Sequence, residues 1–183
     1  MIMTVAELKQ FIATDEANKV LEAKLQALEL LIRAYTNNNF QSRGWRTSAC
    51  IRGGVFISET LIPFAVGDTV MVSQSRLQDG SLFTVKEVAG DTTFTVNENA
   101  ADEEDILVTK VVYPMDVKVG VANLIKWQYQ NGDKVGISSE TISRHSVTYF
   151  NMDGDNSTMG FPKSLLGFLR PYMKARFGQE VRL

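Results

Sequence analysis

The first 39 residues carry apolar side chains at helical spacing. Thr4 and Glu7 form a capping-box pattern, in which each side chain can accept a hydrogen bond from the backbone of the other residue. We expect a first helix to follow Thr4 and to end near Thr14. A longer helix should follow Asp15, which can cap it, and should stop at the asparagines 37–39, since asparagine tolerates the left-handed conformation that ends helices. The apolar stripe of this second helix consists of Ala17, Leu21, Leu25, Leu28, Ile32 and Tyr35. Its solvent side should carry Glu22, Glu29 and Arg33.

From residue 40 to residue 113 the period changes from 3.6 to two, and β-branched residues become frequent. Short alternating runs at 69–72, 82–88 and 94–96 each follow a Gly-Asp or Asp-Gly turn, which predicts an antiparallel meander that curls into a small sheet or barrel. Further strands are expected at 45–51, 55–61 and 107–113. The acidic run 102–105 should form a solvated loop before the last of them.

Helical spacing returns after Pro114, and this helix should end before Asn131. We expect one strand at 138–150 and then a terminal helix that begins at Pro162. Its apolar stripe contains Leu165, Phe168, Leu169, Tyr172, Met173 and Phe177, and its basic residues are Lys163, Arg170 and Lys174.

Pro171 interrupts the terminal helix. It lacks a backbone donor and clashes with the carbonyl of Gly167, so the helix should kink or break there. The aromatic and basic segment 172–183 could then move separately and anchor a partner protein.

Helices, an all-β block and helices again are the pattern of a β-domain inserted into a helical domain. The predicted fold is therefore α+β, a small bundle of about four helices plus a strand or hairpin, with an inserted antiparallel β-domain. Residues 1–39 and 114–183 should form the helical domain, and residues 40–113 the insert.

Composition limits the possible functions. The 183 residues include 19 Lys and Arg against 21 Asp and Glu, which gives a net charge of -2 and no overall basic field. Cys50 is the only cysteine, which excludes an internal disulfide and a zinc site made of several thiolates. The first residues do not read as a secretory signal, and no window has the 18 or so apolar residues of a membrane span, so a cytoplasmic site of synthesis and no membrane partner are expected.

The residues that could carry chemistry lack partners in the sequence. His145 is the only histidine, and a lone strand histidine is more often packed or on the surface than catalytic. Cys50 more often behaves as a small apolar group. Asn151, Asp153 and Asp155 begin like a calcium loop, but Pro162 occupies the position where a bidentate glutamate should close it. We predict no catalytic, metal or cofactor site, and a binding or structural role rather than an enzyme.

Several phrases of the chain resemble the head-tail connector, or adaptor, proteins of long-tailed bacteriophages and prophages. They are TVAELKQFI, AYTNNNF, YPMDVKVGVANLIKW, GISSETISRHSVTYF and FPKSLLGFLRPYMKARF, in this order. The resemblance covers the helical parts, roughly 110 residues. The β-insert is similar to inserts of some longer members, whereas compact members have a short loop there.

The resemblance implies a structural virion protein that does no catalysis. Such proteins assemble as a ring of about twelve copies under the portal protein at the capsid vertex, extend the DNA channel and bind a tail-side neck or stopper protein. DNA passes through without sequence-specific binding, and the protein is made in the host bacterial cytoplasm. On this basis the residues expected to dock on the portal are Tyr172, Met173, Arg176, Phe177, Arg182 and Leu183.

Two other functions stay open. The first is a nucleic-acid-binding packaging accessory, with Lys163, Arg170, Lys174, Arg176 and Arg182 as a basic strip and Phe168, Tyr172 and Phe177 between them. The second, more distant, is a small hydrolase that uses His145.

Overall fold

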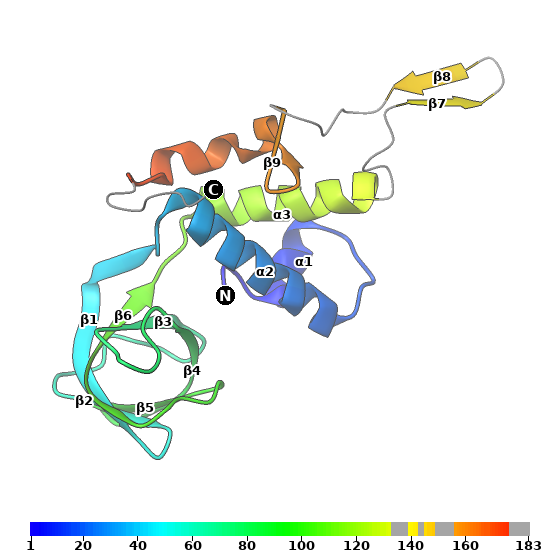
Figure 1. Cartoon of the computed structure of the whole chain (residues 1–183). Coiled ribbons are helices and arrows are strands. Elements are labelled where there is room, and N and C mark those ends of the chain that lie inside the picture. The colour runs from blue at the N-terminus through cyan, green and yellow to red at the C-terminus, as the bar shows by residue number, and fades with distance from the viewer. Residues whose placement is uncertain (133–138, 143–144, 149–155, 176–183) are drawn as a thin grey trace. The chain divides into compact units, whose positions relative to one another are not determined.

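The computed structural model describes residues 1–132, 139–142, 145–148 and 156–175 (Figure 1). The chain divides into two compact units. One consists of Asn39–Tyr113 together with Met1, and the other of Ile2–Asn38 and Pro114–Leu183. The fold is α+β, with an antiparallel β-domain inserted between N-terminal helices and a C-terminal helix, as the sequence predicts.

Helix α1 (Val5–Phe11) begins with the predicted capping box. The hydroxyl of Thr4 accepts the backbone N–H of Glu7 at 3.1 Å, and the Thr4 N–H donates to the Glu7 carboxylate at 2.8 Å. The same carboxylate accepts Lys118 Nζ at 3.0 Å, which links α1 to the later helix α3 (Met115–Asn131). The helix ends at Phe11, earlier than expected.

Helix α2 (Asn18–Thr36) ends as predicted, with Asn37 in the left-handed conformation at φ 49°. Its start differs, because no side chain caps it and Asp15 lies outside it. The four central leucine and isoleucine residues of the predicted stripe are buried, and so is Glu29. The expectation that Glu29 faces solvent is wrong because position 29 lies four residues after Leu25 and three before Ile32, within the buried stripe.

The inserted unit is a closed antiparallel barrel with the strand order β1-β2-β5-β4-β3-β6. The meander β3-β4-β5 confirms the turn-based prediction. Its interior contains a phenylalanine cluster in which the Phe56 and Phe94 ring centroids lie 4.7 Å apart, with Phe83 and Phe64 packed edge-on against them. The strands are β1 (Gln41–Arg52), β2 (Val55–Ser58), β3 (Thr69–Ser73), β4 (Leu82–Ala89), β5 (Thr93–Val96) and β6 (Glu103–Val111).

The acidic run 102–105 is solvated as expected, with Asp102, Glu104 and Asp105 exposed, but it is not a loop, since β6 begins at Glu103. Its carboxylates accept hydrogen bonds that hold neighbouring loops. Asp102 accepts the Gly53 N–H at 2.8 Å, and Glu103 accepts the Ser75 hydroxyl. Glu104 forms an ion pair with Arg52 at 3.0 Å. Pairing of β6 with its neighbours and the hydrogen bonds from these donors stabilise the acidic segment in an extended strand. Its high charge, taken alone, predicts a loop.

The C-terminal part of the helical unit also differs from expectation. Strands β7 (Ser139–Ile142) and β8 (His145–Thr148) form an antiparallel hairpin in place of one strand over 138–150. A second short pair, β9 (Ser157–Thr158) and β10 (Phe161–Pro162), precedes the terminal helix. That helix, η3 (Lys163–Tyr172), is a 3₁₀ helix that begins one residue after Pro162.

Candidate docking site

The 3₁₀ geometry of η3 determines which side chains it buries. With three residues per turn, side chains three apart lie in one line. Leu166 and Leu169 are buried in one such line, whereas Gly167 and Arg170 are exposed in another. The α-helical stripe predicted from sequence omitted Leu166, because 3.6-residue spacing and three-residue spacing select different positions.

Helix η3 runs antiparallel to α3 (Figure 1). At one end the rings of Trp127 on α3 and Phe161 just before η3 have centroids 5.8 Å apart. In the middle, Gly120 of α3 leaves room for the ring of Phe168, since a Cβ atom at Gly120 would lie 2.5 Å from two of its carbons. At the other end Tyr172 reaches the first turn of α3.

The Tyr172 hydroxyl contacts Asp116 at 2.8 Å from each carboxylate oxygen and donates its proton there. This hydrogen bond, together with partial desolvation and the charge of Asp116, raises the pKa of Tyr172. The Tyr172 carbonyl accepts the side-chain amide of Asn38 at 3.0 Å. Tyr172 is thus hydrogen-bonded both to α3, through Asp116, and to the residues just after α2, through Asn38.

The chain after Tyr172 is held by the C-terminal end of α2. The Lys174 N–H donates to the Thr36 carbonyl at 2.8 Å, and the Asn37 side-chain amide donates to the Ala175 carbonyl at 2.9 Å. The helix does end beside Pro171, but 172–175 do not form the separate segment expected after that proline. Asn37, which is left-handed, and Asn38, whose N–H donates to the Arg33 carbonyl, both end α2 and bind the segment 172–175.

The predicted docking residues fall into two groups. Tyr172 is half-buried and engaged with Asp116, whereas Met173 is 50% exposed. The other four predicted residues, Arg176, Phe177, Arg182 and Leu183, lie outside the described residues. Sequence reasoning missed the parts played by Asp116 and by the asparagines after α2. The only local signal is that each stands at a helix end, where polar side chains can meet backbone or hydroxyl groups from distant segments.

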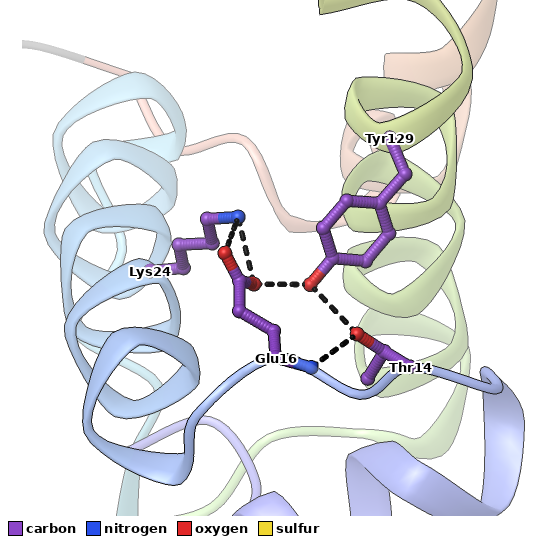
Figure 2. Close-up of polar contacts among 4 residues, drawn as sticks. All are labelled: Thr14, Glu16, Lys24 and Tyr129. Carbon is purple, nitrogen blue, oxygen red and sulfur yellow. Dashed lines mark hydrogen bonds and ion pairs between the residues drawn. The ribbon is translucent and has the colours of Figure 1, made fainter.

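A second polar cluster lies at the other end of α3 (Figure 2). Both carboxylate oxygens of Glu16 lie 2.8 Å from Lys24 Nζ on α2, and the hydroxyl of Tyr129 on α3 donates to the same carboxylate. Thr14 accepts the Glu16 N–H at 3.2 Å and lies 3.4 Å from the Tyr129 hydroxyl. The hydrogen bond from Lys24, followed by the one from Tyr129, lowers the pKa of Glu16. A paired, ionised carboxylate is a poor general base. The contacts of this cluster instead join the α1–α2 connection to α2 and α3.

Of the other chemical candidates, Cys50 has a partner within the described residues: a hydrogen bond from Arg52 and, more weakly, one from the Cys50 side chain lower the pKa of Glu104. His145 is in β8, opposite Ile142, and Cys50 is half-buried in β1. Asn151, Asp153 and Asp155 lie outside the described residues. Where the structure describes the chain, no group of three or more His, Cys, Asp or Glu residues is placed to hold a metal ion. In the same residues, no helix has the length and apolar character needed to cross a membrane.

No protein-family model matches this chain, and no curated protein has a matching sequence.

Proposed function

We propose that this protein is a head-tail connector that assembles as a ring under the portal of a long-tailed phage or prophage. The proposal rests on the resemblance of the helical phrases. The structural observation that carries it is the anchored segment Tyr172–Ala175, which α2 and α3 hold in place while Met173 and Lys174 remain exposed. A surface presented from a fixed position on a helical unit suits docking on a preformed partner.

The proposed mechanism is multivalent attachment. A portal ring offers the same site many times, so a weak contact by each connector subunit adds to a strong attachment of the whole ring. Heterologous contacts between neighbouring copies would close the ring and continue the DNA channel toward a tail-side neck or stopper protein. The residues proposed to contact the portal remain Tyr172, Met173, Arg176, Phe177, Arg182 and Leu183.

Negative-stain electron microscopy of purified portal rings, with and without the protein, tests the class of function. We expect added ring-shaped density at one end of the portal. Portals that look the same at saturating protein concentration would refute the proposal. Deletion of residues 176–183 then tests the docking assignment, because a truncated chain that still co-sediments fully with portal rings would exclude that segment from the contact.

A second candidate, a nucleic-acid-binding packaging accessory, is favoured by one observation. Lys163, Arg170 and Lys174 are exposed, and none of them forms an ion pair within the described part of the chain. Retention on duplex DNA that falls steeply as salt rises from about 50 mM would support this function. A chain that is not retained even at about 50 mM salt would exclude it.

A further inference from the structure

Exposed apolar side chains gather at one end of the α3–η3 pair. Met115 at the start of α3 is 64% exposed, Val119 one turn later is 37% exposed, and Met173 after η3 is 50% exposed. Met115 and Val119 are four residues apart on one helix, so their side chains are neighbours on its surface.

The Tyr172–Asp116 hydrogen bond brings Met173 to the same end. Met115 immediately precedes Asp116, and Met173 immediately follows Tyr172, so both methionines flank a pair of residues joined at 2.8 Å. Two exposed methionines from segments more than 50 residues apart in sequence therefore flank this hydrogen bond, and Val119 lies one turn from Met115 on α3.

Two cations lie on either side of Met173 along the chain. Arg170 is exposed and lies one 3₁₀ turn before Met173, and Lys174 follows Met173 directly. Within the described residues neither side chain forms an ion pair. The nearby carboxylate, Asp116, accepts the Tyr172 hydroxyl. We call Met115, Val119, Arg170, Met173 and Lys174 the apolar-basic surface.

We propose that the apolar-basic surface binds a segment of the portal protein in which apolar residues are flanked by carboxylates. This inference rests on the proposed function and deepens it, because it adds α3 residues to the docking contact and specifies the chemistry of the partner. Methionine is flexible and polarisable and adapts to irregular apolar partners, which suits a contact made by Met115 and Met173. Arg170 can bind a carboxylate with two parallel hydrogen bonds, and the positive charges of Arg170 and Lys174 are complementary to an acidic partner.

A protein segment fits this surface better than nucleic acid does. Phosphates would use Arg170 and Lys174 but would leave Met115 and Val119 uncovered. The aromatic residue of this region, Tyr172, is half-buried with its hydroxyl bound to Asp116, so it is poorly placed to stack on a base. Exposed apolar residues together with two exposed cations instead match an amphipathic acidic segment, in which both kinds of contact form together.

The test measures the affinity of the full chain for purified portal rings at two salt concentrations. The first variant combines Met115→Ser with Met173→Ser, and the second combines Arg170→Glu with Lys174→Glu. Leu30→Ser and Lys19→Glu are the matched controls, because both residues are exposed on α2 and are not part of the surface. All substituted side chains are exposed, so circular dichroism should show unchanged folding.

We expect each double variant to weaken portal binding at least about tenfold, while both controls bind like the wild-type chain. The charge variant should also reduce the salt dependence of binding. If the wild-type chain binds portal rings and both double variants bind equally well, the assignment of the apolar-basic surface to the portal contact is refuted. The proposed connector function would not be affected by that result. A wild-type chain that does not bind portal rings would refute the proposed function and this inference together.

Two further outcomes would assign the surface to another partner and so overturn the inference. If only the charge variant loses binding and duplex DNA competes with the portal, the surface binds phosphates. If the methionine variant abolishes self-association of the chain in sedimentation velocity but leaves portal binding intact, the surface binds a second copy.

Discussion

Replacement of Gly120 by alanine tests the packing of η3 on α3. In an open helix this change stabilises by about 1 kcal/mol, because alanine loses less backbone entropy on folding. Here the new methyl group would lie 2.5 Å from two ring carbons of Phe168 and 2.6 Å from a third. Overpacking of this kind typically costs about 1–3 kcal/mol. We therefore expect Gly120→Ala to lower the free energy of unfolding by about 1 kcal/mol.

A double-mutant cycle separates the clash from the helix propensity. When Phe168→Ala has removed the ring, Gly120→Ala should stabilise the chain by about 1 kcal/mol, so the effect changes sign. The resulting coupling energy is about 2 kcal/mol. The packing contact alone predicts this reversal, because a Gly-to-Ala effect on the unfolded chain would be the same in both backgrounds.

Urea denaturation followed by tryptophan fluorescence can isolate the helical unit. The chain has two tryptophans, Trp45 on the barrel and Trp127 on α3, so a Trp45→Phe background leaves a probe of α3 alone. Gly120→Ala that stabilises by about 1 kcal/mol with Phe168 present would refute the proposed close packing.

Three further predictions concern other parts of the structure. Thr4→Ala should lower the free energy of unfolding by about 1 kcal/mol in urea titrations, because it removes the capping hydrogen bond to Glu7, and no loss would contradict a stabilising capping box. Hydrogen bonds from the Thr4 backbone and then from Lys118 lower the pKa of Glu7, so its contribution is present above its unfolded pKa of about 4.3 and is lost as pH falls. The difference in unfolding free energy between wild type and Glu7→Gln should therefore shrink below about pH 4, and a pH-independent difference would refute this cause. Phe56→Ala should destabilise the barrel by about 3–5 kcal/mol, measured by Trp45 fluorescence in a chain without the second tryptophan, and a loss below about 1 kcal/mol would exclude Phe56 from a tightly packed core.

Local patterns in the sequence predicted local structure well. The Thr4–Glu7 capping box, the end of α2 at Asn37 and the change of period at residue 40 each depend on residues within a few positions of one another. Turn residues likewise predicted the β3-β4-β5 meander. Such features follow from backbone preferences and side-chain spacing, which are the same in any fold.

The errors had two causes: contacts between distant segments, and spacings that fit more than one kind of helix. Glu103 and its acidic neighbours read as a loop because their donors, Gly53 and Ser75, lie far away in sequence. The terminal helix read as α-helical because its apolar residues fit 3.6-residue spacing nearly as well as three-residue spacing.

The candidate site was predicted only in part. Tyr172 and Met173 were selected for their aromatic and apolar character, but the partner of Tyr172 is Asp116, 56 residues earlier. No pattern within the terminal segment indicates that partner. The exposure of Met115 and Val119, on which the further inference depends, also becomes visible only once η3 is placed beside α3.

The closure of the barrel bears on how the chain folds during synthesis. Its first and last strands meet at their outer ends, where Gln41 pairs with Val111, the Val112 N–H donates to Phe40, and the Phe40 and Tyr113 rings lie 4.7 Å apart. The barrel is almost one contiguous stretch, so its strands can pair on the ribosome before α3 emerges. Once closed, it holds residues 40 and 112 together by strand pairing, so a stretch of more than 70 residues no longer acts as a flexible loop between α2 and α3. The late helices then join α1 and α2 with little further loss of chain entropy.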